Sequence, residues 1–525
     1  MAEAGALTHA ARGRCISDII RLQARRTPEK CALIFEGRQD TYAALDDAVN
    51  RAANALLRNG VSAGDRVAIF SHNNRTMVVL RFAIARAGAI FTPVNFMLNA
   101  GELAYILEHS GAHMLIAEDA LCSLADEAMR QMKQPPVTKA FILHEGGEVP
   151  SGWMSADAWL DAADASPVIN LRGEDEAVQL MYTSGTESRP KGALLSTRAL
   201  LAQYVSCIIG GGMEQSDIEL HCLPLYHCAQ LDCFLSVDLY LGATSILLRA
   251  PDPAKILATI AAERVTKLFA PPTIWIALLR HPDFDKLDLS SLAKGYYGAS
   301  IMPTPVIEEL LRRLPGLRLW NFYGQTEMAP MATVLQPEDQ LRKLGSAGKP
   351  AINVETRIVD DDENDVAVGV TGEIVHRSPQ AMLGYYNDSA KTDEAFKGGW
   401  FHSGDLGFMD DEGFLFVVDR KKDMIKTGGE NVASREIEEI LFAHPAVAEA
   451  AVFGAPHPHW IEAVTAVIVL RAGAAADLEG LEAYCRERLA AYKRPKQIII
   501  AEALPKNASG KILKRELRLQ YAVPA

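Results

Sequence analysis

The stretch TSGTESRPKG, residues 183–192, contains the residue types needed to bind a polyphosphate. Hydroxyl groups that can donate to anionic oxygens come from Thr183, Ser184 and Thr186. Gly185 permits backbone geometry closed to other residues, and Lys191 adds a compact positive charge. A Walker A loop is excluded, because Pro190 precedes the lysine and Gly192 follows it. The pattern predicts a phosphate-binding loop, although a polar surface turn has a similar composition and distant residues must decide.

Composition favours a globular enzyme with a large cleft. The chain has 525 residues, of which 49% are hydrophobic and 23% charged, enough for a sizeable core and more than one domain. Its net charge of -13 argues against nucleic acid as a main partner, since a phosphate backbone requires a basic surface. A nucleotide such as ATP would have to meet locally placed positive charge.

The 8 cysteines show no C-x-x-C pair and indicate a reducing compartment. Cys222, Cys228 and Cys233 surround His221 and His227, which raises a metal site as an alternative, but we interpret these thiols as apolar packing beside a pocket. No apolar run approaches the roughly 20 residues of a membrane span, and the first residues lack the apolar centre of a signal peptide. We therefore expect a cytoplasmic protein without a membrane span.

Helical and strand patterns alternate along most of the chain. A helical pattern at 41–57 is followed by strand RVAIF at 66–70, a second helix closing at Gly88, and strands at 244–248 and 267–270. This alternation predicts an α/β fold with layered, largely parallel sheets flanked by helices. After Arg420 the pattern changes to a unit of about a hundred residues. We expect it to have helices near 435–442 and 478–489, strands near 447–453 and 463–470, and a last strand at QIIIA.

Seven motifs in a fixed order resemble those of the adenylate-forming superfamily, which includes acyl-CoA synthetases, adenylation domains and luciferases. They are TSGTESRPKG at 183–192, PLYH at 224–227, YGASIMP from Tyr297, NFYGQTE at 321–327, GWFHSGD at 399–405, DRKKDMIKTGGEN at 419–431 and PKNASGKI at 505–512. The resemblance covers nearly the whole chain and is closest to fatty acyl-CoA synthetases. It implies a large N-terminal domain at 1–420 with ATP and acyl pockets, and a mobile C-terminal lid at 421–525 that pivots at Lys422.

The resemblance implies three residues that act on the reacting groups and one metal ligand. Lys511 would bridge the carboxylate and phosphate oxygens while charge shifts between them, His227 would lie beside the substrate carboxylate, and Thr326 would belong to the same centre. Glu327 would hold Mg²⁺ beside the triphosphate, because a carboxylate there would otherwise repel ATP. In isolation, Lys511 could be a solvated lysine in a basic tail and His227 a core histidine.

The remaining implied residues bind the nucleotide or CoA. The phosphate loop would use Thr183, Ser184, Gly185, Thr186 and Lys191; the adenine side would use Gly298, Ala299, Ser300, Asn321, Phe322, Tyr323 and Gly324; and the ribose would use Asp405 and Arg420. Tyr323 would offer its aromatic face to the base. Gly429 matches the glycine beside the pantetheine tunnel, where a side chain would block passage.

Two departures from the family pattern bear on affinity and pocket shape. Glu187 and Ser188 replace the usual threonine and glycine, and Glu187 puts negative charge near phosphates unless it points to solvent, pairs with Arg189 or engages the metal. YGAS replaces the frequent GGAP, which changes the expected acyl pocket. Apolar residues expected around that pocket are Leu231, Phe234, Trp275, Tyr296, Met302 and Met328.

The function implied is an AMP-forming acyl-CoA synthetase that uses ATP, Mg²⁺ and coenzyme A on a fatty acid of medium or longer chain, with aromatic acids as the second choice. Alternatives are an acyl-AMP ligase that loads a carrier protein, and a non-catalytic acyl-nucleotide sensor that the altered phosphate loop keeps open. An amino-acid adenylation domain fits less well, since Cys228 stands where an aspartate usually binds the amine, although Asp232 lies near. The sequence leaves the oligomeric state open, a homodimer included.

Overall fold

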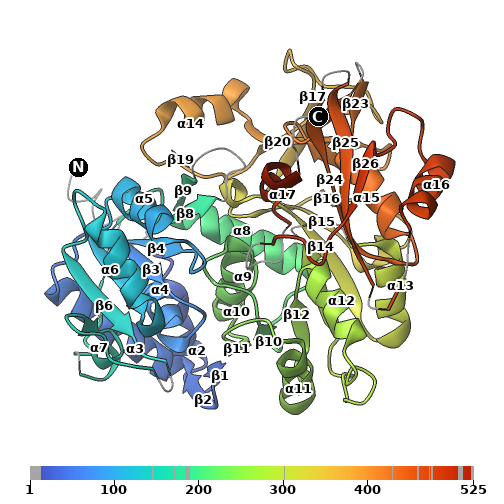
Figure 1. The fold of residues 1–525 in the computed structure, drawn as a ribbon. Coiled ribbons are helices and arrows are strands. Elements are labelled where there is room, and N and C mark those ends of the chain that lie inside the picture. The colour runs from blue at the N-terminus through green and yellow to red at the C-terminus, as the bar shows by residue number, and fades with distance from the viewer. Residues whose placement is uncertain are drawn as a thin grey trace.

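The computed structural model describes residues 14–144, 147–162, 164–169, 172–183, 190–298, 300, 302–427, 430–457, 460–471, 473–474, 477–506 and 512–521. Two large sheets dominate the fold and lie side by side in Figure 1, one in blue and cyan and the other mainly in green and yellow. Most neighbouring strands within them are parallel, and helices flank both sheets. The expected α/β architecture is confirmed.

The first sheet has strand order β19-β9-β8-β4-β3-β5-β6-β7. Its strands are β3 (Arg66–Phe70), β4 (Ile90–Val94), β5 (Met114–Glu118), β6 (Thr138–Ile142), β7 (Met154–Ser155), β8 (Ala177–Thr183), β9 (Lys191–Ser196) and β19 (Gly384–Tyr385). The helices before and between these strands are α2 (Asp18–Arg26), α3 (Tyr42–Arg58), α4 (Arg75–Arg86), α5 (Ala100–Ser110), α6 (Cys122–Arg130) and α7 (Asp157–Ala162). Side chains of α4 are buried all round, because this helix packs inside the molecule.

The second sheet has strand order β16-β15-β14-β13-β12-β10-β11-β1-β2. Its strands are β1 (Cys31–Phe35), β2 (Arg38–Thr41), β10 (Ile218–His221), β11 (Thr244–Leu247), β12 (Lys267–Phe269), β13 (Lys294–Gly298), β14 (Arg318–Gly324), β15 (Met331–Leu335) and β16 (Lys349–Pro350). Its helices are α8 (Thr197–Gly211), α9 (Cys228–Gln230), α10 (Ser236–Leu241), α11 (Pro253–Glu263), α12 (Pro272–Arg280) and α13 (Thr304–Arg313). A π-helical turn, Leu231–Leu235, joins α9 to α10.

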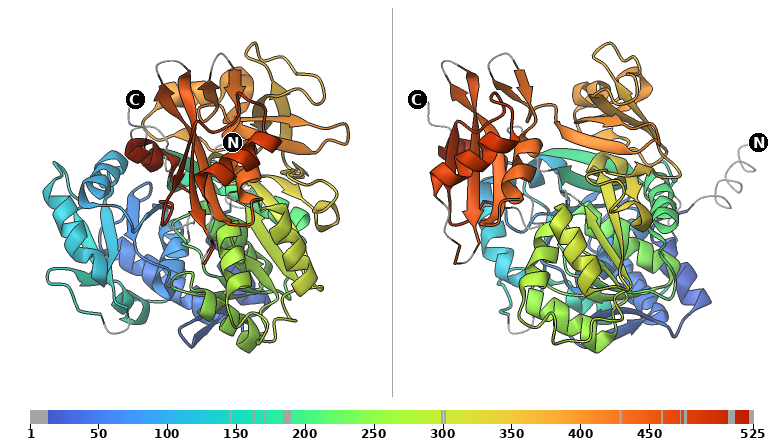
Figure 2. Two further views of the ribbon diagram at one scale, coloured as in Figure 1. Left: turned by 45° about the vertical axis from the view of Figure 1, so that its right-hand side comes forward. Right: turned by 90° about the vertical axis from the view of Figure 1, so that its right-hand side faces the viewer.

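A smaller antiparallel sheet follows, made of β17 (Glu355–Val359), β18 (Gly372–Arg377), β20 (Phe401–Met409) and β21 (Leu415–Arg420), with helix α14 (Ser389–Ala395) before β20. The C-terminal elements are β22 (Ile425–Thr427), β23 (Glu430–Val432), α15 (Ser434–Phe442), β24 (Val447–His457), β25 (Ile461–Leu470), α16 (Leu478–Arg488), β26 (Gln497–Ile500) and α17 (Lys514–Tyr521). Figure 2 shows them, in orange-red, as a unit beside the rest of the molecule, and two clusters of buried residues lie wholly within this unit.

Candidate active site

One cleft of about 2320 Å³ lies where the carboxyl ends of strands from both large sheets face the C-terminal unit. This is the edge at which open α/β sheets bind ligands. Every predicted site residue that the structure describes lines the cleft: Thr183, Lys191, His227, Gly298, Ser300, Asn321, Phe322, Tyr323, Gly324, Thr326, Glu327, Asp405, Arg420 and Lys422. Ser184, Gly185, Thr186, Ala299, Gly429 and Lys511, together with Glu187 and Ser188, lie outside the described residues.

The two strands on either side of the predicted phosphate loop pair with each other. Strands β8 and β9 are antiparallel, and Thr183 lies directly opposite Lys191. The Lys191 ammonium is 5.1 Å from the centre of the Tyr385 ring, and the Tyr385 hydroxyl donates a 2.9 Å hydrogen bond to Glu327. Tyr385, which the sequence analysis missed, therefore connects the predicted phosphate lysine to the predicted metal ligand.

Glu327 has donor chemistry suited to a hard divalent cation. Its carboxylate lines the cleft, and only its Oε1 accepts from Tyr385. Thr326, its neighbour, adds a hydroxyl whose oxygen is 3.2 Å from the Cys228 sulfur. Carboxylate and hydroxyl oxygens together with phosphate oxygens are the ligands that Mg²⁺ prefers.

The predicted ribose site is built on adjacent strands. Asp405 on β20 is paired in register with Arg420 on β21, and the Arg420 Nε is 3.5 Å from the Asp405 Oδ1. The Tyr323 hydroxyl donates to the other carboxylate oxygen at 2.7 Å. Burial, and then the Asp405 charge, raise the pKa of Tyr323 well above its ordinary value, so Tyr323 keeps its proton and donates. Its hydroxyl thus orients Asp405, a contact not foreseen from the sequence.

We expect Tyr323→Phe to raise the KM for ATP about threefold to tenfold, because Asp405 loses a donor worth about 0.5–1.5 kcal/mol. The KM for the carboxylic acid should stay unchanged. Steady-state kinetics with each substrate varied in turn would measure this, and equal changes in both KM values would contradict the assignment.

Two glycines at this edge allow backbones to approach closely. A Cβ on Gly298 would lie 2.5 Å from the Phe322 carbonyl oxygen on the next strand, and one on Gly324 would lie 1.9 Å from the Pro330 carbonyl oxygen. Any side chain would therefore displace the backbone of the cleft wall. Asn321 on β14 is held by a 3.3 Å hydrogen bond from its amide to the Ser346 carbonyl, while Ser300 is exposed in the cleft.

His227 caps the short helix α9. Its Nδ1 accepts a hydrogen bond from the Ala229 backbone amide at 3.2 Å, so the neutral ring carries its proton on Nε2. The segment before it is fixed by Asn73, whose amide donates to the carbonyls of Leu223 at 2.8 Å and Leu248 at 3.0 Å and accepts from the Leu225 amide at 2.8 Å. Asn73 follows β3 and thus ties the first sheet to the His227 loop.

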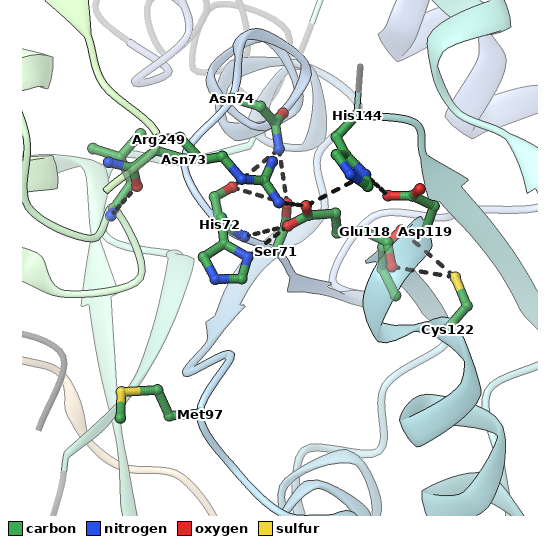
Figure 3. A network of polar contacts seen from close by, with 12 residues as sticks. Ser71, His72, Asn73, Asn74, Met97, Glu118, Asp119, Cys122, His144 and Arg249 are labelled. Atoms are coloured by element: carbon green, nitrogen blue, oxygen red, sulfur yellow. Dashed lines mark hydrogen bonds and ion pairs between the residues drawn. The ribbon is translucent and has the colours of Figure 1, made fainter. Parts of the chain in front are cut away.

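A polar cluster lies beside Asn73 where β3, β5, β6 and β11 end (Figure 3). The buried Glu118 carboxylate accepts from the His72 ring at 2.7 Å and contacts Arg249, while His144 lies 2.5 Å from Asp119. Burial, and then the Arg249 charge, lower the pKa of His72 to about 4, so its neutral ring donates to Glu118. Both Glu118 oxygens are thus engaged by protein donors, and we interpret this cluster as structural.

The acyl wall differs in part from the sequence prediction. Phe234 and Met302 line the cleft, but Leu231, Trp275, Tyr296 and Met328 are core residues that pack behind it. The Trp275 indole, for example, donates to the Tyr296 carbonyl at 3.1 Å. These side chains share the apolar character of a pocket wall, and sequence alone does not distinguish a wall from the layer behind it.

Asp232 is turned away from the cleft. It lies on the π-helical turn, accepts from the Gln179 amide at 2.7 Å and lies 3.8 Å from Arg81. Burial raises its pKa to about 6. Asp232 therefore does not face an amine in the cleft, which removes the feature that kept amino-acid activation open. Of the predicted thiol cluster, Cys233 accepts from the Gln203 amide at 3.2 Å and Cys228 contacts Thr326.

The chain is similar to known proteins along most of its length. The family model described as AMP-binding enzyme matches residues 20–386, and the model for the AMP-binding enzyme C-terminal domain matches residues 436–511. The chain is 38% identical to a feruloyl-CoA synthase of an Amycolatopsis species over 95% of this chain and 97% of the relative. It is 34% identical to the long-chain-fatty-acid–CoA ligase FadD13 of Mycobacterium tuberculosis over 92% and 93%.

Among solved structures, the anthranilate CoA ligase AuaEII in complex with anthranoyl-AMP superposes with a TM-score of 0.89 at 27% identity, covering 97% of both chains. Across the part of the chain that the structure describes, no helix combines the length and apolar character required to cross a membrane.

Proposed function

Because this chain belongs to the AMP-binding enzyme family, whose related members are acid–thiol ligases, we propose that it activates a carboxylic acid with ATP and transfers the acyl group to coenzyme A. The observation that carries the proposal is the convergence of the separated motif residues on one cleft bordered by the C-terminal unit. Seven motifs spread over some three hundred residues would not meet there if they were unrelated surface turns.

In the first step a carboxylate oxygen attacks the α-phosphorus of ATP, and the bond to pyrophosphate breaks. Thr183 and Lys191 would hold the phosphates, and Asp405 with Arg420 would hold the ribose. Lys511 would neutralise the charge that two approaching anions share. Glu327 would bind Mg²⁺, which when bound offsets the negative charge of the phosphate oxygens.

In the second step the CoA sulfur attacks the acyl carbon, the bond to AMP breaks, and the thiol proton passes to solvent. We propose that His227, with its proton on Nε2, donates to the carboxylate oxygens of the bound acid before the first step, while the acid is still a free carboxylate. The chain would divide at 420/421 into an N-terminal domain and a lid, with Lys422, at the turn after β21, as the hinge. Gly429 would border the path of the pantetheine arm.

We expect Gly429→Leu to slow thioester formation roughly tenfold or more and to leave acyl-adenylate formation near the wild-type rate, because a side chain would narrow the pantetheine path only. Pyrophosphate release and acyl-CoA formation, measured separately on one preparation, would check this. Loss of both half-reactions would contradict the tunnel assignment.

The acid itself is the finer part of the proposal. The sequence motifs favoured a fatty acid of medium or longer chain, and the long-chain-fatty-acid–CoA ligase relative supports that class. An aromatic acid is a second candidate, which the feruloyl-CoA synthase relative and the aromatic wall at Phe234 and Phe269 favour. Transfer to a carrier protein is the alternative for the acceptor.

The test is pyrophosphate release with a panel of aliphatic acids of increasing length and of aryl acids, followed by acyl-CoA detection with free CoA. Turnover by any acid with CoA supports the ligase. Adenylate formation without acyl-CoA, but with acylation of a phosphopantetheinyl carrier protein, would favour the carrier-protein alternative. Nucleotide binding without pyrophosphate release from any acid would overturn the ligase and favour a sensor.

A further inference from the structure

Stacked aromatic rings line one part of the cleft. The Phe234 ring stacks on Phe269 with centroids 4.3 Å apart and on Phe322 at 5.7 Å. Tyr296 packs edge-on against Phe234 at 5.2 Å and donates its hydroxyl to the Gly211 carbonyl at 2.7 Å. A Cβ on Gly211 would lie only 2.9 Å from the Phe322 ring, so helix α8 rests directly on this layer. Phe234, Phe269 and Phe322 line the cleft, and such flat rings suit another ring better than a long chain.

Two polar side chains that line the same cleft have no hydrogen-bond partner among the described residues. Gln325 follows β14, Thr273 begins α12 after β12, and both line the cleft. Among the described residues, neither the amide nitrogen nor the amide oxygen of Gln325 has a hydrogen-bond partner, and neither has the Thr273 hydroxyl, although all three atoms are buried. Such groups are rare in folded proteins and call for a partner.

The neighbours of Gln325 in the YGQTE motif make contacts that do not involve its side-chain amide. Its neighbour Thr326 already contacts Cys228, and Glu327 is held by Tyr385. Gly324, on its other side, lies against the Pro330 carbonyl with no room for a side chain. None of these contacts involves the polar side-chain atoms of Gln325, the third residue of the YGQTE motif. A primary amide offers two donors and one acceptor oxygen, which a hydroxyl matches because it both donates and accepts.

We propose that Gln325 selects the acid substrate by hydrogen bonding to a hydroxyl group on its ring, with Thr273 as a secondary partner. The substrate class is therefore a ring-hydroxylated aromatic acid rather than an unsubstituted or long-chain one. This inference rests on the proposed function, since it concerns the acyl pocket of the same ligase. A site that hydrogen bonds to a hydroxyl group of the substrate discriminates against acids without that hydroxyl, because the buried polar groups of the site are then left unpaired.

The experiment compares kcat/KM for pyrophosphate release with benzoate, cinnamate and their ring-hydroxylated counterparts, and with decanoate. For the wild-type enzyme we expect the hydroxylated acid of a pair to be favoured about tenfold to a hundredfold. Gln325→Met keeps the length of the side chain and removes the amide. The kcat/KM values of the two acids in a pair should then become about equal, while kcat/KM for the unsubstituted acid stays at its wild-type value. Thr273→Val should reduce the preference by a smaller factor.

Gln39→Leu, at an exposed position on β2, is the matched control and should leave the preference intact. Thermal melting of each variant would separate misfolding from altered selectivity. Three results would overturn the inference and leave the ligase proposal intact. The wild type could show equal kcat/KM for both members of every pair, or it could prefer decanoate. The Gln325→Met variant could show the same decrease in kcat/KM for the hydroxylated and the unsubstituted acid. No pyrophosphate release from any acid would instead overturn the proposed function.

Discussion

Lys511→Ala is expected to slow acyl-adenylate formation by at least about a hundredfold while sparing transfer from a preformed acyl-adenylate to CoA. Two anions must approach in line, and a cation placed where their charges meet stabilises the transition state more than the ground state. Removal of one such electrostatic contact typically costs about 10²–10³ in kcat. The second step starts from a mixed anhydride that has already lost pyrophosphate, so it does not need this cation.

The residues on either side of the Lys511 segment are held in place. Lys506 pairs with Ile512 in an antiparallel bridge, and its ammonium lies 2.6 Å from Glu449. Beyond the segment, Lys514 lies 2.8 Å from Glu438 and donates to the Ser434 hydroxyl at 2.6 Å. Lys506, Ile512 and Lys514 also line the cleft. Anchored residues on both sides of Lys511 reduce the conformational entropy lost when the lysine is brought to the reacting groups, which supports the assignment.

The measurement separates the half-reactions. Pyrophosphate release should fall with Lys511→Ala, and acyl-CoA formation from chemically prepared acyl-adenylate should persist. Lys493→Ala, which removes a surface ion pair with Glu436, is a matched lysine control for which no change is expected. If Lys511→Ala formed acyl-adenylate at the wild-type rate, another cation would have to be assigned the role.

The sequence predicted the elements well because their patterns are local. The helical period at 41–57 corresponds to α3, and the apolar runs at 66–70 and 267–270 correspond to β3 and β12. The antiparallel pairing of β8 with β9 was not foreseen, since pairing depends on contacts that period alone does not specify. Likewise, Trp275 and Tyr296 are as apolar as a pocket wall, yet they form the layer behind it.

The site residues that the sequence missed act through partners far along the chain. Tyr385 meets Glu327 and Lys191 only because β19 pairs with β9, and Asn73 reaches the His227 loop only because two sheets abut. Gln325 stood inside a recognised motif, but its lack of hydrogen-bond partners is a property of the folded chain. Motif order could locate the cleft, whereas the connections between motifs required the tertiary structure.

Lys267→Ala is expected to lower the free energy of unfolding by about 3–5 kcal/mol, because it leaves a buried carboxylate without its cation. Glu219, His221, Asp238 and Lys267 are all fully buried where β10, α10 and β12 meet. The Lys267 ammonium lies 2.7 Å from Glu219 and contacts Asp238, and the His221 Nε2 is 3.3 Å from Asp238. No other described cation pairs with these two carboxylates.

Lys267 and Asp238 each stabilise the charged form of the other. Burial alone would lower the pKa of Lys267, but the charges of Asp238 and Glu219 outweigh it and hold that pKa well above its ordinary value. Burial opposes the charged form of Asp238 too, yet Lys267 brings the pKa of Asp238 below its ordinary value. Burial, and then the Asp238 charge, raise the pKa of Glu219 well above its ordinary value. The charged form of Asp238 thus depends on the Lys267 ammonium beside it.

The loss of stability in Lys267→Ala should therefore depend on pH. Without the ammonium, burial favours the protonated form of the Asp238 carboxyl group. The pKa of Asp238 in the folded variant therefore rises above its value in the unfolded chain, about 3.9. A raised pKa gives stability that is present below the unfolded pKa and is lost as pH rises toward the folded pKa. Relative to wild type, the variant should lose up to about 1.4 kcal/mol per pH unit on going upward from about pH 4, and it should be least stable at alkaline pH.

Urea unfolding of wild type and variants between pH 5.5 and 8.5 would check this. Lys286→Ala, which removes an exposed pair with Asp283, should cost less than about 1 kcal/mol at every pH. Lys267→Met combined with Asp238→Asn removes the cation and the carboxylate together, and it should regain most of the lost stability at pH 8 and show a flat pH dependence. If Lys267→Ala unfolded at the wild-type urea concentration at pH 8, or if the double variant remained as unstable as the single one, the cluster would not depend on the Lys267 charge.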